Sequence, residues 1–321
     1  MQRRQTILRL AALAVVGALG SLGLACGGGA GAAGASGKLV YGSPTDIRQY
    51  DFDAHTDAKL LAGSSPGRFA NGDLVYVYAD SISAPYQIVM GDAAGTRRTQ
   101  VLKPGAAVGD FRPVPSPDGK LIAFTYYPRG FTPQINATNG TVIVRPDGTI
   151  VANLKGVFDP AWTPDGRIVA AGTIAVASDG PTNTPTAAGI YVSNAAFTAM
   201  TRLDNGLADP REVAVSPDGK QLAFVLAGHI WTMGLDGTGP RQLTSGDKEE
   251  SSPAFSPDGE SVACASFGTF ESTYYSALAV VPVAGGPTAL SNDANVWPLD
   301  DDAKGTSTLG RVNVYKRLNW F

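Results

Sequence analysis

The sequence predicts an all-β fold: a six-bladed β-propeller of four-stranded antiparallel blades, with the ring closed by strands from the N- and C-terminal ends of the chain. The first observation is a Ser/Thr-Pro-Asp-Gly segment that occurs four times, with spacings of 47, 53 and 40 residues between successive aspartates. Repeats of that length are typical of one small antiparallel sheet each. The second observation is a nearly unbroken apolar run after every copy, which indicates strands covered on both faces.

The repeated segment has the composition of a tight turn. Pro presets φ at its second position, and Gly accepts the left-handed conformation at its end. We interpret these Asp and Gly residues as structural, because they occupy one equivalent position in every repeat and do not form one convergent site. They are Asp118, Gly119, Asp165, Gly166, Asp218, Gly219, Asp258 and Gly259. Asn71, Gly72 and Asp73 form a degenerate fifth copy.

Each repeat continues with a third apolar run and a fourth, polar segment, which complete the four strands of a blade. In the last copy, the fourth strand is expected at Pro287–Asp293. Whole blades are expected to begin near Pro66, Gly109, Val157, Asp209 and Lys248. The sequence therefore predicts five complete blades within the chain.

The sixth blade is expected to join the two ends of the chain. Lys38–Ser43, Ile47–Phe52 and Ala58–Leu61 have the pattern of second, third and fourth strands, and no first strand precedes them. Asn295–Leu299, with the sequence NVWPL, has the register of a first strand and is expected to supply it. Closure of this kind removes the free sheet edge of an open array. One alternative stays open, in which Arg311–Tyr315 is the second strand of this blade and Lys38–Ser43 is displaced.

These residues resemble the TolB-like β-propeller repeat. Its hallmark is a Gln-Leu-Thr strand, an acidic residue, Pro-x-Phe/Trp-Ser-Pro-Asp-Gly-Lys and then Leu-Ala-Phe; Gln242–Ala263 matches this pattern nearly throughout. Val213–Phe224 and Pro113–Phe124 also match, and the resemblance extends over Lys38–Leu299. It implies the propeller architecture, but propellers carry many unrelated activities, so the resemblance does not specify a function.

Residues 1–25 are interpreted as a lipoprotein-type signal peptide, because three arginines precede the apolar run Leu10–Leu24 and Cys26 follows it. The run has about 15 apolar residues, whereas a helix needs about 20 to cross a bilayer. We therefore favour an export signal over a membrane-spanning anchor. Residues 26–37 form a flexible Gly/Ala/Ser tether, and residues 38–321 form the propeller.

A signal segment, a cysteine and a tether in this order resemble a bacterial lipoprotein. The resemblance implies lipidation of Cys26 and attachment to a membrane through acyl chains, of which two or more are needed for stable anchoring. The expected location is the exported cell envelope, at the periplasmic face or the cell surface. Arg3 and Arg4 leave a twin-arginine export signal open as an alternative. Cys264 would then be alone, so no disulfide framework is expected.

Composition excludes several classes of function. The chain of 321 residues has a net charge of −3 and 17% charged residues, and its folded part has no Lys/Arg cluster larger than a pair such as Arg97 and Arg98, so nucleic-acid binding is not expected. Two His and two Cys are too few for a zinc site, and Asp300–Asp302 is interpreted as a solvated acidic turn rather than a calcium loop. No metal and no cofactor are expected. The chain leaves no length for the separate α/β domain that holds the nucleophile in a hydrolase of the prolyl oligopeptidase type, so that class is not expected.

A candidate binding site emerges when the repeats are aligned by their turns. The residue four positions before the Ser or Thr of each turn recurs in place but differs in type, which is where a specific function can lie. We expect these residues and two neighbours to line one mouth of the central channel and to bind a small polar ligand or an extended segment of a partner. The candidates are Asp110, Arg112, Asp159, Glu212, Glu250 and Trp297. The alternative, that they pair with one another as a structural ring, stays open.

The sequence favours a non-catalytic, lipid-anchored envelope protein, monomeric, whose propeller is a platform for binding an envelope protein or a small polar ligand. The alternative is an enzyme that acts on a saccharide or a similar polar polymer at the channel mouth. In that case Asp159 and Glu212 would serve as acid and base. Two carboxyl groups about 5 to 9.5 Å apart beside a cleft would favour the enzyme.

Overall fold

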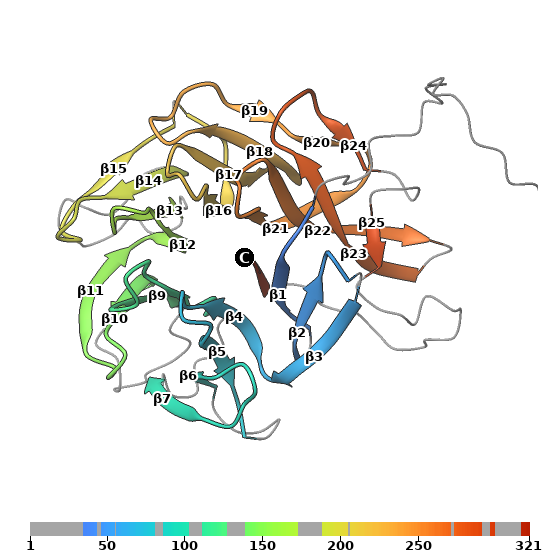
Figure 1. Cartoon of the computed structure of the whole chain (residues 1–321). Coiled ribbons are helices and arrows are strands. Elements are labelled where there is room, and N and C mark those ends of the chain that lie inside the picture. The colour runs from blue at the N-terminus through green and yellow to red at the C-terminus, as the bar shows by residue number, and fades with distance from the viewer. Residues whose placement is uncertain are drawn as a thin grey trace, which may run out of the picture.

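The computed structural model confirms the predicted fold class. It places six four-stranded antiparallel sheets around a central axis (Figure 1). The structure describes residues 35–43, 46–54, 56–80, 86–102, 111–126, 139–172, 188–204, 206–270, 273–290, 296–298 and 316–321. No helix in this part of the chain is long and apolar enough to cross a membrane.

The strands of each blade are given from the axis outward. The first blade has β26 (Lys316–Trp320), β1 (Lys38–Gly42), β2 (Asp46–Asp51) and β3 (Thr56–Ala62). The second has β4 (Ser64–Arg68), β5 (Leu74–Tyr78), β6 (Gln87–Gly91) and β7 (Arg98–Leu102). The third has β8 (Val114–Pro115), β9 (Ile122–Tyr126), β10 (Gly140–Val144) and β11 (Ile150–Lys155).

The remaining blades follow the same order. The fourth has β12 (Val157–Trp162), β13 (Ile168–Gly172), β14 (Gly189–Ser193) and β15 (Met200–Arg202). The fifth has β16 (Arg211–Val215), β17 (Gln221–Leu226), β18 (His229–Gly234) and β19 (Arg241–Gln242). The sixth has β21 (Glu249–Phe255), β22 (Ser261–Phe270), β23 (Thr273–Pro282) and β25 (Val296–Pro298).

The hydrophobic core is divided among the joints between neighbouring blades. Six clusters of buried side chains are present, and each draws its residues from two adjacent blades. In one of them, Val75 and Val77 of the second blade pack against Phe111 and Phe124 of the third. The second strand of a blade has a neighbour on both faces, which explains why its residues are apolar without alternation.

The ends of the chain close the ring, as predicted. β26 is the inner strand of the first blade and pairs with β1, so that Trp320 lies opposite Leu39. The Trp320 ring stacks on Phe52 with 4.6 Å between centroids, and its Nε1 donates a hydrogen bond of 2.7 Å to the Ser36 carbonyl. Asn319 Nδ2 donates to the carbonyl of Pro66, which ties the closing strand to the second blade. The closing strand lies beside the axis in Figure 1, where the C-terminus is marked.

The segment that closes the ring differs from the predicted one. The prediction that Asn295–Leu299 is the first strand of the closing blade is wrong, because β25 pairs with β23 and is the outer strand of the sixth blade. The alternative in which Lys38–Ser43 is displaced is also wrong, because β1 is the second strand of its blade. In this pairing, Leu318 to Trp320 take the register of Pro253 to Phe255 in the sixth blade.

The predicted fourth strand of the last repeat also has a different partner. Thr288–Ala289 forms β24 and pairs in parallel with β20 (Thr244–Ser245), which follows the fifth blade. The Thr288 N–H donates to the Leu243 carbonyl at 2.8 Å. This segment therefore bridges the fifth and sixth blades, and β25 completes the sixth. A parallel bridge of two residues carries no periodic pattern from which a partner could be chosen.

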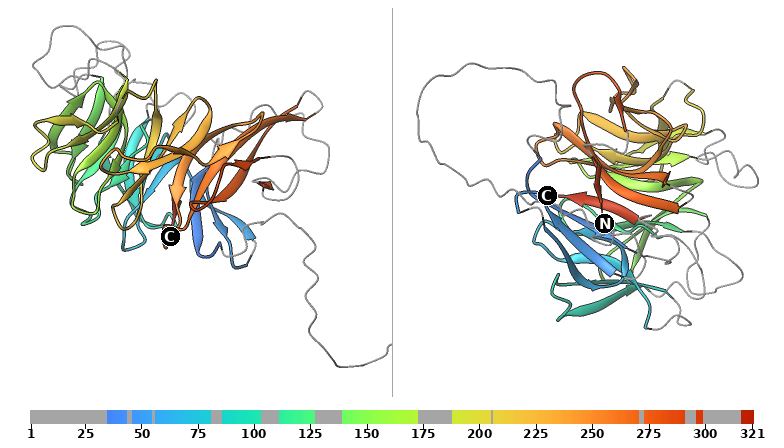
Figure 2. Two further views of the ribbon diagram at one scale, coloured as in Figure 1. Left: turned by 90° about the horizontal axis from the view of Figure 1, so that it is seen from above. Right: turned by 90° about the vertical axis from the view of Figure 1, so that its right-hand side faces the viewer.

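The alternating strand direction gives the propeller two different rims, of which Figure 2 shows side views. The turn rim carries the Ser/Thr-Pro-Asp-Gly turns between first and second strands, together with the turns between third and fourth strands. The mouth rim carries the connections between second and third strands and the crossovers from one blade to the next. Each inner strand begins at the mouth rim, so residues early in it lie close to that opening of the channel.

Candidate functional site

The repeated aspartates of the turn rim are engaged within their own turns. The Ser116 hydroxyl donates to Asp118 Oδ1 at 2.7 Å, and the Lys120 N–H donates to the same oxygen at 3.1 Å. Equivalent contacts recur in the fifth and sixth blades, and in the fourth with Thr in place of Ser. The hydroxyl contact is the largest influence that holds the pKa of each turn aspartate below its usual value. The arrangement supports a structural role.

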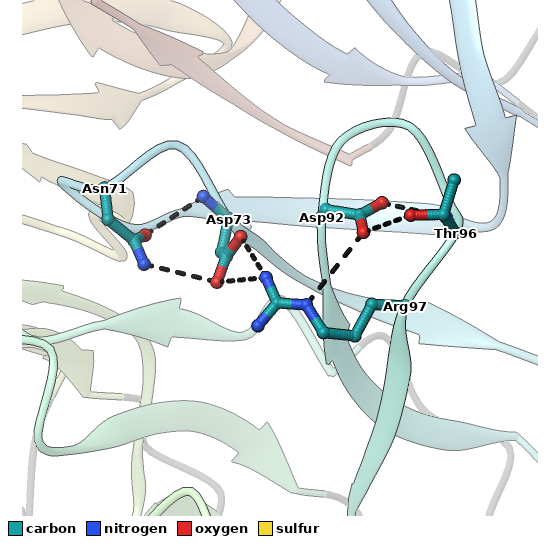
Figure 3. Close-up of polar contacts among 5 residues, drawn as sticks. All are labelled: Asn71, Asp73, Asp92, Thr96 and Arg97. Carbon is teal, nitrogen blue, oxygen red and sulfur yellow. Dashed lines mark hydrogen bonds and ion pairs between the residues drawn. The ribbon is translucent and has the colours of Figure 1, made fainter.

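The degenerate turn of the second blade uses a different set of contacts (Figure 3). Arg97 Nη2 donates to both carboxylate oxygens of Asp73 at 2.8 and 2.9 Å, and its Nε lies 3.9 Å from Asp92. Thr96 donates its hydroxyl and its N–H to Asp92, and Asn71 contacts Asp73. Arg97 therefore joins the two turns of this blade at the turn rim. The basic residue at this position is therefore paired within its own blade.

The mouth rim has its own repeated feature, a left-handed backbone at one position of the inner strand. It is shared by five blades, with φ between 37° and 55°, at Ser65, Arg112, Asp159, Glu212 and Ser252. Four of these positions lie where the pairing of the inner strand with the second strand skips a residue, which is a β-bulge. The bulge removes the side chain from the regular alternation of the strand. The four sequence-predicted positions in the third to sixth blades all have the left-handed backbone conformation.

Three of these side chains meet although they come from three blades. Arg112 Nη1 lies 2.9 Å from Glu212 Oε1 and 3.4 Å from Asp159 Oδ1. Their side chains are 13%, 17% and 24% exposed, so the ion pairs are partly shielded from solvent. Glu212 Oε2 also accepts the N–H of Ser252, and the Asp159 N–H donates to Thr125 Oγ1 at 2.8 Å. We name Arg112, Asp159 and Glu212 the mouth triad.

The charge around the mouth triad is unbalanced. Arg211 is paired with Asp209, which is the largest cause of its raised pKa, and the charges of Glu212 and Asp159 raise the pKa further. The triad itself holds two carboxylates and one guanidinium group, and the neighbouring pair of Arg211 and Asp209 adds one charge of each sign.

The other predicted mouth residues lie elsewhere. Glu250 does not line the opening, because its side chain has no exposed surface and faces the fifth blade. Trp297 belongs to the outer strand β25, so its placement in a closing inner strand is corrected. Asp110 lies outside the described residues, as do Cys26 and Asp300–Asp302.

Two residues at this repeated position of the inner strand were not predicted from the sequence. Ser65 was overlooked because the turn of the second blade is degenerate, with Phe69 in the place of Ser. In the closing blade, two residues, Arg317 and Leu318, lie opposite the single residue Tyr41. This irregularity of the strand pairing places Arg317 at the position that corresponds to the left-handed residues of the other blades. Counting four residues back from Phe69 would have identified Ser65, whereas Arg317 required the strand pairing.

Glu250 instead lies at the joint between the fifth and sixth blades. Its Oε2 accepts the Thr244 hydroxyl at 2.6 Å and lies 3.0 Å from His229 Nδ1, while the Glu250 N–H donates to the Gly228 carbonyl. Oε1 is buried and has no hydrogen-bond partner. Desolvation by burial is the main reason that the pKa of Glu250 is raised, and the two hydrogen bonds oppose this rise without cancelling it.

A family model described as the TolB beta propeller domain matches residues 61–266. The structure is similar to TolB from Acinetobacter baumannii, at 19% identity and a TM-score of 0.58, over 78% of this chain and 65% of that protein. It is also similar to a putative TolB from Agrobacterium tumefaciens, at 17% identity and a TM-score of 0.56, over 82% of this chain and 88% of that one. No curated protein matches.

A further similar structure is hydrazine synthase from Kuenenia stuttgartiensis, at 13% identity and a TM-score of 0.57, over 82% of this chain and 46% of that one. At these identities the structural similarity shows the fold alone. The same propeller architecture therefore occurs in proteins with unrelated names, and the function has to be argued from the residues of this chain.

Proposed function

Because the chain belongs to the TolB beta-propeller domain family, we propose that it is a non-catalytic protein of the bacterial cell envelope, anchored by lipid at Cys26. In this proposal the propeller is a binding platform, and its mouth rim captures an extended segment of a partner protein or a small polar ligand. The excess of carboxylates at the mouth triad favours a segment that carries lysine or another cationic group.

The observation that carries this proposal is the ring of left-handed residues. A non-glycine residue in that conformation costs about 1 to 3 kcal/mol and persists only where the surrounding structure requires it; such residues cluster at binding sites. Here the strain recurs in five blades while the side chain changes from Ser to Arg, Asp and Glu. A purely structural ring would not need this variation.

The geometry favours binding over acid and base catalysis. Asp159 and Glu212, the carboxylates that could act as a pair, both contact the same guanidinium nitrogen of Arg112. An acid and base pair needs one carboxyl that holds a proton and one that is free to accept it. In the mouth triad both carboxylates instead contact one shared guanidinium group, an arrangement that suits charge recognition better than proton transfer.

The test compares two substitutions in the fourth blade. Asp159→Asn removes one carboxylate from the mouth triad and leaves Arg112 its shorter contact with Glu212, whereas Asp165→Asn makes the same change in the turn at the opposite rim. Wild-type and variant chains are immunoprecipitated from solubilised native envelopes, and the retained proteins are identified by mass spectrometry.

We expect Asp159→Asn to lose a partner that wild type and Asp165→Asn both retain, and a lysine-rich peptide to displace this partner more effectively than an acidic one. Identical retention by all three chains would contradict the proposed site. Equal loss in both variants would also contradict it, because the effect would then not depend on the mouth.

The anchor is tested separately. Cys26→Ala should release the protein from the membrane fraction into the soluble extract of the native host, and mass spectrometry of the wild-type N-terminus should find acyl chains on Cys26. Retention of Cys26→Ala in the membrane fraction would contradict lipid anchoring while leaving the mouth proposal intact.

A further inference from the structure

The sixth blade carries a β-hairpin that extends beyond its own blade at the mouth rim. β22 and β23 have ten residues each, whereas the second and third strands of the other blades have five or six. β22 pairs with the inner strand β21 only as far as Phe267, which lies opposite Glu249. β23 pairs with the outer strand β25 only as far as Ala277, which lies opposite Pro298. The hairpin therefore continues past both flanking strands, and Figure 2 shows it projecting from the ring.

Hydrogen bonds at the other end of the hairpin determine where the backbone groups of this extension point. The Ser261 carbonyl accepts the N–H of Ser256, on the side of β21. The Glu260 carbonyl accepts the N–H of Val283, on the side of β23. These directions alternate along a strand, and β22 and β23 pair without a shift in register. Odd-numbered residues of β22 therefore direct their N–H and C=O toward β21 and the axis, and Thr269 is the one that lies beyond the end of β21.

The outer strands of the six blades each carry a feature that hinders pairing with another chain. A β-bulge interrupts β3, β7 and β11, and β15, β19 and β25 have at most three residues. Bulges and very short strands are common ways of protecting a free sheet edge. The described part of the hairpin extension has neither, and Gly268–Phe270 and Thr273–Ser276 contain no charged residue and no Pro. Its edge is therefore open to another strand.

The axis-facing edge of β22 lies within reach of the mouth triad. Glu212 accepts the N–H of Ser252, which belongs to β21. Ser252 lies three residues from Glu249 along β21, and Thr269 lies two residues beyond Phe267 along β22. At about 3.3 Å per residue, these five steps correspond to about 16 Å. An extended segment of about five residues covers that distance.

We propose that an extended segment of a partner protein adds a strand to the axis-facing edge of β22 at Gly268–Phe270 and places a cationic side chain, about five residues further on, at the mouth triad. The backbone of the segment pairs with the N–H and C=O of Thr269, which is the β-augmentation mode of recognition. Antiparallel addition continues the direction of β21, so a stretch of β-forming residues such as Val and Thr precedes the cationic residue. This inference rests on the function proposed above, because the cation is assigned to the carboxylates of the triad.

The test measures the binding of two fluorescent peptides to the purified full-length chain by fluorescence anisotropy. The first peptide is Thr-Val-Thr-Val-Gly-Ser-Gly-Lys, and the second has Ala in place of the lysine. Thr269→Pro removes the N–H at the axis-facing edge without removing a bond to β23, whereas Thr269→Ala retains it. Tyr274→Pro is the matched control, because Tyr274 lies opposite Thr269 and its N–H points to the other edge of the hairpin. Thermal unfolding establishes that each variant is folded.

We expect Thr269→Pro to bind the lysine peptide about tenfold more weakly than wild type, because a backbone hydrogen bond is lost and the proline ring obstructs the edge. Thr269→Ala and Tyr274→Pro should bind the peptide as wild type does. In wild type, the peptide should slow amide hydrogen exchange at Thr269 and leave it unchanged at Tyr274.

Asp159→Asn separates this inference from the proposed function. If Asp159→Asn weakens binding of the lysine peptide and Thr269→Pro does not, the mouth site stands and the edge site is wrong. If Thr269→Pro weakens both peptides and Asp159→Asn weakens neither, the edge site stands and the role of the triad is wrong. Absence of peptide binding to wild type overturns the edge site. A wild-type dimer that Thr269→Pro abolishes also overturns it, because the edge would then pair with a second copy of the chain.

Discussion

Two carboxylates are buried at joints between neighbouring blades, Asp204 in a crossover and Glu250 on the inner strand β21, and their pKa values shift in opposite directions. Asp204, between the fourth and fifth blades, occupies the position that Thr244 takes between the fifth and sixth, since each receives the N–H of the corresponding Ile, Ile190 or Ile230. Both Asp204 and Glu250 have almost no exposed side-chain surface. Burial alone therefore does not distinguish them.

The difference lies in the number of hydrogen-bond donors. Burial would raise the pKa of Asp204, but Arg202 and the N–H groups of Ile190, Leu207 and Gly206 outweigh it and hold that pKa below its usual value. Glu250 has one oxygen without a partner, and its pKa is raised. A buried carboxylate whose oxygens are all hydrogen-bonded stabilises the fold, whereas one with an unsatisfied oxygen is costly to bury in its charged form.

The largest expected effect comes from Asp204→Ala. It leaves the guanidinium of Arg202 and three backbone N–H groups without their acceptor, so we expect a loss of about 3 kcal/mol or more in the free energy of unfolding. Urea denaturation measures it. Asp204→Asn, which keeps an acceptor oxygen, should lose less. A loss below about 1 kcal/mol for Asp204→Ala would show that the donors are satisfied without the carboxylate.

The second prediction compares the same two joints at the turn rim. A β-carbon on Gly219, at a φ of 71°, would lie 2.9 Å from Pro164 Cδ of the preceding blade, whereas one on Gly259, at 75°, would lie 3.7 Å from Pro217 Cδ. Both Ala substitutions incur the cost of the left-handed backbone, roughly 1 to 2 kcal/mol, and Gly219→Ala also forces the Pro164 ring to move. The free energy of unfolding should therefore fall more in Gly219→Ala. Equal losses would indicate that the turn adapts without strain.

The third prediction concerns pH. The lowered pKa of Asp204 means that its contribution to stability is complete above the unfolded pKa near 4 and is lost as the pH falls through the folded value. The raised pKa of Glu250 has the opposite sign, so its contribution is present at low pH and is lost as the pH rises through the folded value. Glu250→Gln should therefore gain stability relative to wild type between pH 4 and pH 7.5. Urea denaturation across that range would show a constant or falling difference if this sign were wrong.

The smallest effect on stability is expected from His229→Gln. The side chain is partly exposed, and the Gln amide can replace Nδ1 as a donor to Glu250, so we expect a change within about 0.5 kcal/mol in the free energy of unfolding, measured by urea denaturation. A loss well above that value would show that the imidazole makes a contribution that the amide cannot replace.

The number of blades, their order and the structural role of the turns could be predicted from sequence. A repeated Ser-Pro-Asp-Gly turn is local chemistry, and Ser116, Asp118 and Gly119 make their contacts within a few residues of one another. The apolar runs likewise reflect burial on both faces of one strand. Each of these patterns lies within a short stretch of chain, so it can be recognised without knowledge of the tertiary structure.

The sequence also aligned Arg112, Asp159 and Glu212, because equivalent positions of a repeat point in equivalent directions. It could not assign Glu250 to a joint rather than to the channel, since strand residues alternate and the bulge at Ser252 and Pro253 changes which of them faces the axis. His229 and Thr244 become neighbours of Glu250 only when the fifth blade packs against the sixth.

By itself, the sequence determined a ring of six similar blades with polar residues of varying type at one repeated position, because turn chemistry and strand burial are local. The tertiary structure decided which segment closes the ring, that Arg112 reaches Glu212 two blades away, and which buried acid is left without a full set of donors. Those outcomes depend on contacts between residues far apart in the chain. Such contacts are set by the packing of one blade on the next, and no short stretch of sequence contains them.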